Sequence, residues 1–199
     1  MKRPAVALAA VATLGAGLWY LTRQPEQAAS VNTPSPLNFI RGLISMTPGI
    51  RNNNPFNMRD YNIPWLGRVG ADKAGLLIFD KVENGIRAAG NDLKNGWLKG
   101  ETTISKIVSA WAPPKGKAQD GTEYTNPTEK YIQFVSQQTG IAPNKELSSF
   151  GEYVAIGKAM IKMENGKNPY DDALIAKSLR VGMTYGQPLP FYFDWSAYA

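Results

Sequence analysis

The chain has 199 residues, which is enough for one globular domain of ordinary size and an accessory segment. It contains no Cys and no His, so disulfides, thiolate metal sites and His-based triads are excluded, and acid–base chemistry falls to carboxylates or, less readily, to Lys or Tyr. The net charge of +6 favours a polyanionic partner such as anionic lipid, nucleic acid or an acidic cell-wall polymer, but no basic run is dense enough to single out nucleic acid.

The first segment, residues 1–23, has the composition of a membrane anchor. An uncharged stretch, Pro4–Thr22, follows Lys2 and Arg3 and just reaches the roughly 20 residues that a helix needs to cross a bilayer. The two positive residues favour a cytoplasmic N-terminus. A cleaved signal peptide is the alternative, which the long apolar region and the poor cleavage site disfavour. We therefore expect a single-pass, membrane-anchored protein whose globular domain lies on the non-cytoplasmic side.

Three further regions follow the anchor. Residues 24–48 are predicted to form a polar, proline-bearing linker and a short amphipathic helix over Leu37–Ile44. Residues 49–186 are predicted to form the globular domain. The tail, residues 187–199, is rich in aromatic residues, which indicates docking on the domain or on a partner.

The globular domain is predicted to be mainly α-helical with a minor β-hairpin. The hairpin is expected near Trp65–Gly67 and Leu76–Phe79. Helices are predicted from apolar periodicity and from capping signals, among them the pairs Asp80 with Glu83 and Ser149 with Glu152. The predicted helices are Asp80–Trp97, Ile104–Trp111, Thr128–Thr139, Ser149–Met163 and one from Asp171 or Asp172 to about Val181. The segment Lys115–Pro127 is predicted to be a polar loop.

The segment Gly49–Arg59, with the sequence GIRNNNPFNMR, is the most informative stretch of the chain. It is too polar for a core element, since four Asn and two Arg surround one Pro and one Phe. Asn side chains offer both donors and acceptors, and Asn tolerates unusual turn dihedral angles. Such a segment is typical either of a hydrogen-bonded scaffold for the fold or of the wall of a site for a polyhydroxylated ligand.

Glu164 is the acidic residue that stands out, because it continues the helical face that carries Gly157, Met160 and Ile161. An acid at a helix end that faces an apolar wall loses hydration, and its pKa rises. A carboxyl that stays protonated near neutral pH is what a glycosidase needs to protonate a leaving oxygen. The alternative interpretation is a solvated residue of the last turn that meets no ligand.

The other candidates have structural roles that compete with functional ones. Glu83 is sufficiently explained as the partner of a helix cap. Trp97 and Trp111 fall on apolar helical faces and are assigned to the core. Trp65 lies in a polar loop and is the better platform for a sugar ring, and Tyr131 is open to either role.

Several motifs together resemble a domain that is common in virion proteins of tailed and membrane-containing phages. The resemblance covers roughly Gly49 to Gly182 and rests on the order of the motifs. They are Gly49–Arg59 (GIRNNNPFNMR), Asn84–Ala88 (NGIRA), Trp111–Pro114 (WAPP) and Met163–Gly166 (MENG).

Two segments also resemble lysozyme-like enzymes. Lytic transglycosylases of that superfamily carry a catalytic Glu at the end of a helix, followed shortly by Asn-Pro, and Met163–Pro169 is similar. Flagellar-type glucosaminidases carry an Asn-Asn-Leu-Phe-Gly motif and a Trp-x-Gly motif after their Glu. Here Asn53–Asn57 and Trp65–Gly67 look similar but precede Glu164, as in a circular permutation. The resemblance implies a small lysozyme-like fold in which Glu164 folds back against the Asn-rich loop.

The same resemblance implies a mechanism. Glu164 would act first as acid and then as base, with a muramic acid hydroxyl as the internal nucleophile and with no metal or other cofactor. The residues expected to hold the acetamido and hydroxyl groups of the glycan are Asn53, Asn54, Asn57, Trp65 and Tyr131.

The leading hypothesis is a membrane-anchored virion protein that locally degrades peptidoglycan, as a glycosidase or lytic transglycosylase, while the phage genome enters the cell. Its partners would be peptidoglycan, a lipid membrane and other virion proteins. The alternative is a non-catalytic minor structural protein of the virion membrane that binds glycan or the capsid and vertex proteins. A nucleic-acid binder is a third and weaker hypothesis that rests on the charge alone.

Overall fold

The computed structural model of the protein describes residues 46–117, 123–186, 188–190 and 192–196. This part of the chain is mostly helical, as predicted. Its elements are, in chain order, α3 (Pro48–Arg51), β1 (Arg68–Ala71), β2 (Leu77–Phe79), α4 (Val82–Trp97), α5 (Ile104–Trp111), β3 (Lys115–Lys117), β4 (Glu123–Thr125), α6 (Thr128–Thr139), α7 (Phe150–Asn165) and α8 (Asp172–Thr184).

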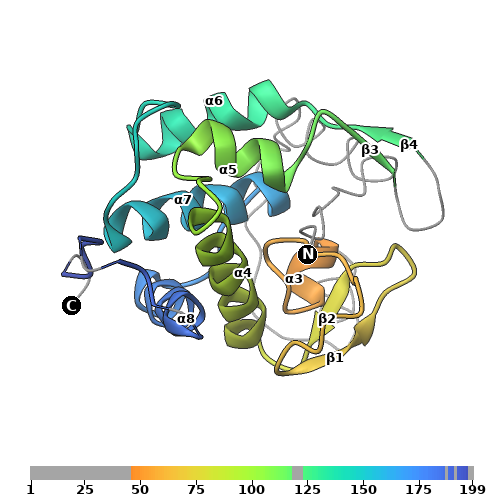
Figure 1. The fold of residues 1–199 in the computed structure, drawn as a ribbon. Helices are drawn as coiled ribbons and strands as arrows, with labels where there is room; N and C mark the ends of the chain where they lie inside the picture. The colour runs from red at the N-terminus through yellow and green to blue at the C-terminus, as the bar shows by residue number, and fades with distance from the viewer. Residues whose placement is uncertain (1–45, 118–122, 187, 191, 197–199) are drawn as a thin grey trace, which may run out of the picture.

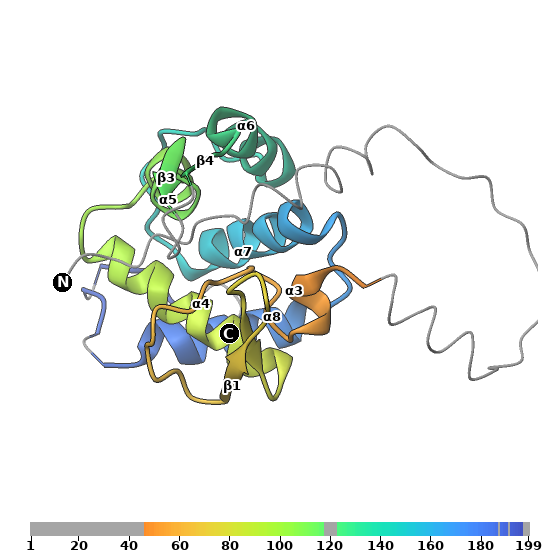
Figure 2. The ribbon, with the colours of Figure 1, turned by 90° about the vertical axis from the view of Figure 1, so that its right-hand side faces the viewer.

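Helix α7 runs through the middle of the molecule. The helices α5 and α6 lie on one side of it, and α4 and α8 lie on the other (Figures 1 and 2). The short helix α3 and the β1–β2 hairpin lie beside α4, and α3 also contacts α7 (Figure 1). Both halves of the molecule therefore pack against one central helix.

The core forms around α7 because its apolar residues are buried on more than one side. Tyr153, Ile156 and Met160 are fully buried. A helix that is apolar around most of its circumference is typical of the centre of a domain. The neighbouring helices add apolar residues at helical spacing, namely Ile86, Ala89 and Leu93 from α4, Ile104, Ile107, Val108 and Trp111 from α5, and Ile175 and Leu179 from α8.

The first β-hairpin is confirmed near its predicted place. β1 and β2 pair antiparallel, with Ala71 opposite Leu77. The outer edge of β2 is covered by the Asn-rich segment, because the Leu77 amide donates to the Met58 carbonyl oxygen and the Phe79 amide donates to the Asn52 carbonyl oxygen, both at 2.9 Å. The hairpin therefore holds this segment in place.

A second hairpin occurs where a polar loop was predicted. β3 and β4 pair antiparallel, with Gly116 opposite Tyr124. The ring of Tyr124 lies directly on Gly116, where a Cβ would be only 2.2 Å from the phenolic oxygen. Strands β3 and β4 lack the alternating apolar residues that indicate a strand, so this hairpin could not be predicted from the sequence.

The capping of α4 differs from the prediction. Its N-cap is Lys81, and no side chain caps the helix. The Asp80 carboxylate accepts a hydrogen bond from the Asn84 side chain at 2.7 Å instead of from a backbone amide. Asp80 therefore fastens the start of α4 through a side chain, and the predicted pair with Glu83 does not form.

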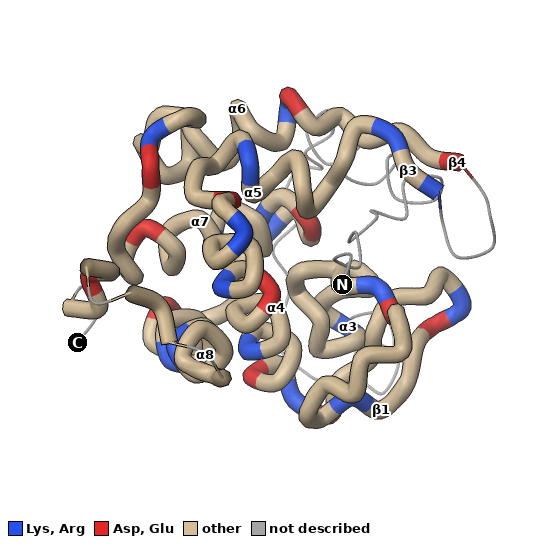
Figure 3. The backbone as a smooth tube through the Cα atoms, in the orientation of Figure 1, with Lys and Arg blue, Asp and Glu red and all other residues tan. Residues whose placement is uncertain are grey.

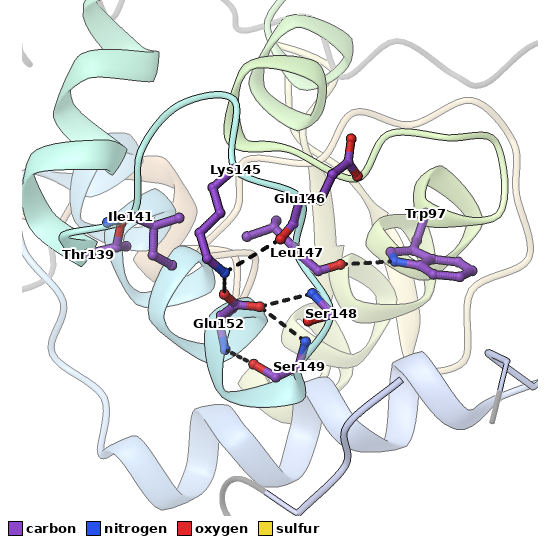
Figure 4. Close-up of polar contacts among 9 residues, drawn as sticks. All are labelled: Trp97, Thr139, Ile141, Lys145, Glu146, Leu147, Ser148, Ser149 and Glu152. Carbon is purple, nitrogen blue, oxygen red and sulfur yellow. Dashed lines mark hydrogen bonds and ion pairs between the residues drawn. The ribbon is translucent and has the colours of Figure 1, made fainter. Parts of the chain in front are cut away.

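The capping box of α7 is confirmed. The Ser149 hydroxyl accepts from the Glu152 amide at 3.4 Å, and the Glu152 carboxylate accepts from the Ser149 amide at 3.1 Å (Figure 4). The same carboxylate forms an ion pair with Lys145. Burial raises the pKa of this carboxyl, but Lys145 and the amides of Ser148 and Ser149 together outweigh it and hold the pKa below its usual range. The first turn of the central helix is thus firmly closed.

The described part of the tail, residues 188–190 and 192–196, docks on the domain. Phe193 is buried and contacts the rings of Trp97, Tyr153 and Trp195. The backbone of Asp194 pairs with that of Ser148 and Phe150. The described tail residues therefore dock on the domain itself, where their aromatic side chains complete the core beside the start of α7.

Charged residues are interspersed over the surface. Lys and Arg positions are spread over both halves of the molecule and alternate with Asp and Glu positions (Figure 3). Among the ion pairs, Lys158 of α7 contacts Asp172 of α8 at 2.6 Å. The described residues thus show a mixed distribution of charge rather than a single basic stripe.

The predicted membrane anchor requires a correction. No helix in the described part of the chain has the length and apolar character needed to cross a bilayer. The longest, α4 and α7, have 16 residues each, whereas a spanning helix needs about 20 apolar residues. The helix predicted at residues 1–23, like the amphipathic helix predicted at Leu37–Ile44, lies outside the described residues. The transmembrane part of the predicted fold and the single-pass membrane localisation are therefore not supported.

Candidate functional site

The Asn-rich segment is ordered by hydrogen bonds from its own side chains. Asn54 is fully buried, and its side-chain amide donates to the carbonyl oxygens of Met58 and Leu77 at 2.8 and 3.0 Å. Its side-chain oxygen accepts from the Met58 amide at 2.9 Å. Asn54 thereby satisfies backbone groups that a loop would otherwise leave without partners, which is a scaffold role.

Asn53 has a similar role at the neighbouring turn. Its backbone has φ +51°, in the left-handed region that Asn adopts more readily than most residues. Its side chain donates to the Phe79 carbonyl oxygen at 3.0 Å. Helix α4 packs closely on this turn, because a Cβ at Gly85 would lie 2.0 Å from the Asn53 carbonyl oxygen. The segment is thus held between β2 and α4.

Asn57 reaches from this segment to the end of α7. Its side-chain amide donates to Glu164 Oε2 at 2.9 Å and to the Glu164 carbonyl oxygen at 3.3 Å. Its backbone also has a left-handed φ, of +50°. The two residues are 107 positions apart, so the chain brings the Asn-rich loop and Glu164 together, as the sequence hypothesis required.

Tyr131 approaches the same carboxyl group from α6. Its hydroxyl donates to Glu164 Oε1 at 3.0 Å, and its ring is buried. Each oxygen of the Glu164 carboxyl therefore has a donor from a different part of the fold. One donor comes from the half that contains α3, and the other comes from the half that contains α5 and α6 (Figure 2).

Loss of hydration dominates the electrostatics of Glu164, although the residue keeps part of its surface exposed to solvent. Loss of hydration raises the pKa of its carboxyl from 4.5 to about 7, although hydrogen bonds from Asn57 and Tyr131 favour the charged form and act in the opposite direction. The indole N–H of Trp111 also faces the carboxyl and lowers the pKa, but it falls short of hydrogen-bond geometry and has no hydrogen-bond partner among the described residues. Asn57 and Tyr131 are therefore the two side-chain donors that orient the group.

The pKa of the Tyr131 hydroxyl rises well above 10, first because of burial and then because of the neighbouring Glu164 charge. Tyr131 therefore stays protonated at neutral pH and donates. An ionised phenol beside Glu164 would place two negative charges in one poorly hydrated space. The pair can hold a proton on Glu164 near neutral pH, and it can release that proton at modest free-energy cost.

The six predicted site residues are thus divided. Glu164, Asn57 and Tyr131 come together, whereas Asn53 and Asn54 support the loop that carries Asn57. Trp65 is partly buried and packs against the hydrophobic core, and its backbone oxygen accepts from the Arg68 amide at 3.1 Å. Among the described residues, no hydrogen bond joins its ring to the Glu164 group.

Two residues near Glu164 were not assigned to the site from the sequence. Trp111 was assigned to the core, and it is indeed buried, but its N–H faces the carboxyl. Asn165 directly follows Glu164 and is also buried. Its position directly after Glu164 could have indicated a role in the site, because a polar residue that follows a candidate acid at a helix end is well placed to hold that acid in position.

The arrangement can transfer a proton. It presents one carboxyl group with a pKa near neutrality, held by two donors whose positions the fold determines. General acids work best when their pKa lies near the working pH. Among the described residues, no group of three or more acidic side chains is arranged to hold a metal ion. A carboxyl with this pKa can give and take a proton near neutral pH.

Comparison with known proteins relates the chain to phages. The chain matches none of the known protein-family models. It is 38% identical over 143 residues to Protein P5 of Pseudoalteromonas phage PM2, and the match covers 69% of the chain and 82% of that protein. The predicted relationship to phage proteins is confirmed by this relative. At this identity and coverage, the chain belongs to the family of Protein P5 of Pseudoalteromonas phage PM2.

Proposed function

We propose that this protein is a virion-associated enzyme that cleaves the glycan strands of peptidoglycan, with Glu164 as the general acid. Its relationship to a phage protein supports a place in the virion. The observation that carries the enzymatic part is the Glu164 carboxyl, whose pKa is raised to about 7 while Asn57 and Tyr131 orient its two oxygens. A lysozyme-like relationship belongs to this proposal, since it rests on the motifs around Glu164 and Asn53–Asn57.

The proposed reaction needs one carboxyl group. Protonated Glu164 gives its proton to the glycosidic oxygen as the bond between that oxygen and the anomeric carbon breaks. The resulting carboxylate then takes the proton of a hydroxyl group on the same muramic acid residue, whose oxygen bonds to the anomeric carbon. This forms an anhydro sugar and returns Glu164 to its protonated state. The reaction therefore consumes no water and needs no second carboxylate.

The residues around Glu164 have separate roles in this proposal. Asn57 and Tyr131 orient the carboxyl and stabilise it in the interval when it is charged, because both are hydrogen-bond donors. Asn53 and Asn54 hold the loop that presents Asn57. Trp65 provides an aromatic surface for a sugar ring outside this group.

The clearing of purified peptidoglycan suspensions tests the proposal. The full-length chain should reduce the turbidity near neutral pH, and Glu164→Gln should abolish clearing because Gln cannot donate the proton. Glu129→Gln is the matched control, since Glu129 is an exposed acid on α6. Equal clearing by the wild type and Glu164→Gln would remove Glu164 from the mechanism.

A non-catalytic structural role in the virion is the second candidate. The observation that favours it is that both carboxyl oxygens of Glu164 already have partners within the chain, as a half-buried structural acid would have. In that case the protein would bind glycan or neighbouring virion proteins without reaction. Retention on purified cell walls, with no release of sugar fragments and no effect of Glu164→Gln, is the result that this candidate predicts.

A further inference from the structure

Asn165 joins the end of α7 to the Asn-rich loop through every part of its side chain. Its side-chain oxygen accepts from the Thr47 hydroxyl at 2.7 Å. Its side-chain amide donates to the Pro55 carbonyl oxygen at 2.6 Å and to the Ile161 carbonyl oxygen at 2.9 Å. Thr47 and Pro55 are 118 and 110 residues away in the sequence, so two of the three bonds are tertiary contacts that bracket the loop.

Asn165 is closely surrounded by the loop. Its side chain is 4% exposed. A Cβ at Gly49 would lie 2.5 Å from Asn165 Oδ1 and 2.5 Å from Asn57 Oδ1. The two Asn side chains therefore converge on one glycine, and the bond from Asn57 to Glu164 is formed directly beside this contact.

A role confined to helix capping does not account for these contacts. The C-cap of α7 is Gly166, whose φ of +72° ends the helix. Only the bond to Ile161 lies within the helix. The bonds to Thr47 and Pro55 fix the start of the loop and a position two residues before Asn57, which is the residue that orients Glu164.

We propose that Asn165 is a positioning residue that clasps the loop 47–57 to the end of α7 and thereby sets the contact between Asn57 and Glu164. Its relevance to catalysis rests on the proposed function. The clasp acts on two features at once. It keeps the Asn57 amide within hydrogen-bond distance of the carboxyl, and it keeps water away from the Glu164 side of the loop. Tyr131, which contacts the other carboxyl oxygen from α6, is the titratable group that faces Glu164 independently of the clasp.

The pKa of Glu164 in the full-length chain tests this proposal without requiring any enzymatic activity. It can be followed by NMR titration of ¹³C-labelled Glu carboxyl groups, with the Glu164 signal identified by its absence in Glu164→Gln. In Asn165→Ala the loop is released, so water reaches the carboxyl and the Asn57 donor is lost. Hydration lowers the pKa of Glu164 and the loss of the donor raises it, but burial is the larger effect, so the pKa should fall by about one pH unit or more toward its ordinary value. Cleavage at about pH 7 should fall by about fivefold or more, since fewer molecules then carry the proton.

Two further variants separate positioning from a loss of stability. Ser149→Ala removes the cap at the other end of α7 and destabilises the same helix by about 1 kcal/mol, yet it should leave the Glu164 pKa unchanged. Thr47→Val removes the donor to Asn165 and should lower the pKa in the same direction as Asn165→Ala, whereas Thr47→Ser keeps the hydroxyl and should behave as the wild type.

The outcomes distinguish the two proposals. A wild-type Glu164 pKa in both Asn165→Ala and Thr47→Val would overturn the clasp, and so would an equal shift in Ser149→Ala. If the pKa moves as expected while the wild type releases no sugar fragments, the clasp stands and the proposed enzymatic function fails.

Discussion

Opposing contributions act on Glu164 at the scale of the single residue. Burial favours the protonated carboxyl, whereas Asn57 and Tyr131 favour the charged form, and burial is the larger effect. The result is a carboxyl whose protonation changes near pH 7 rather than near 4.5. Such a group is suited to give and take a proton within one reaction, and it also makes the fold sensitive to pH.

Substitution of Glu164 by Gln should make the protein more stable at alkaline pH. The folded pKa is about 7, above the ordinary value of 4.5, so the folded state binds this proton more tightly than the unfolded state. The stabilisation from that proton is complete below about pH 4.5 and is lost as the pH rises through about 7. Glu164→Gln cannot ionise and should gain up to about 3 kcal/mol over the wild type at about pH 8.

The measurement is denaturant unfolding of both proteins across this pH range. The difference in free energy of unfolding should grow between about pH 5 and pH 8 and remain flat below about pH 4.5. A difference that does not change with pH would show that the Glu164 carboxyl has an ordinary pKa and would weaken its assignment as the acid.

Substitution of Tyr131 by Phe should move the pH profile of cleavage upward. The Tyr131 hydroxyl lowers the pKa of Glu164, so its loss should raise that pKa, by about one pH unit if the bond contributes about 1.4 kcal/mol. The alkaline limb of the profile should then shift to higher pH. Tyr185→Phe is the control, because the Tyr185 side chain is 66% exposed. An unchanged or lowered limb in Tyr131→Phe would contradict the assigned contact.

At the scale of the elements, the close pairing of α4 with α8 depends on glycine. A Cβ at Gly182 would lie 2.1 Å from the Arg87 carbonyl oxygen, and one at Gly90 would lie 2.6 Å from the Leu179 carbonyl oxygen. Backbone atoms of the two helices therefore approach each other directly. Lys94, which is buried, adds a hydrogen bond to the Tyr185 carbonyl oxygen at the end of α8.

Substitution of Gly182 by Ala should force these helices apart. We expect a loss of about 1–3 kcal/mol in the free energy of unfolding, as for other overpacked contacts. Gly70→Ala is the matched control, because a Cβ at Gly70 meets nothing within 4 Å. Thermal unfolding of both variants checks the prediction, and a Gly182→Ala protein as stable as Gly70→Ala would argue against the close contact.

The sequence predicted elements well where a local signal determines them. Helix α5 ends at Trp111 before two prolines, α6 ends at Gly140 with a left-handed φ of +70°, and α7 begins with the box of Ser149 and Glu152. The cap of α4 was predicted wrongly. The Asp80 carboxylate accepts from the Asn84 side chain instead of from a backbone amide, and sequence rules for helix caps do not take such a competing side chain into account.

At the scale of the whole molecule, the candidate site depends on contacts between distant segments. The position of Glu164 at a helix end and the unusual Asn-rich loop were both visible in the sequence. Their junction was predicted only through a resemblance, and the bonds of Asn165 to Thr47 and Pro55 were not predicted at all. Hydrogen bonds that span more than 100 residues leave no periodic signal, because they depend on how α3 and α7 pack.

The molecule also closes its core with distant parts of the chain. Phe193 of the tail packs against Trp97 at the end of α4 and against Tyr153 of α7. The aromatic composition of the tail indicated docking, but it could not distinguish the domain from a partner. The ring contacts of Phe193 with Trp97 and Tyr153 show that the described part of the tail docks on the domain.

The central claim is that Glu164 donates a proton to break a glycan strand, and the masses of the fragments released from purified peptidoglycan test it most directly. The full-length wild type and Glu129→Gln should release fragments that are lighter by one water than hydrolysis products, because an internal hydroxyl closes the anhydro ring. Glu164→Gln should release none. Release of the same fragments by Glu164→Gln, or no release by the wild type at high protein concentration, would contradict the account.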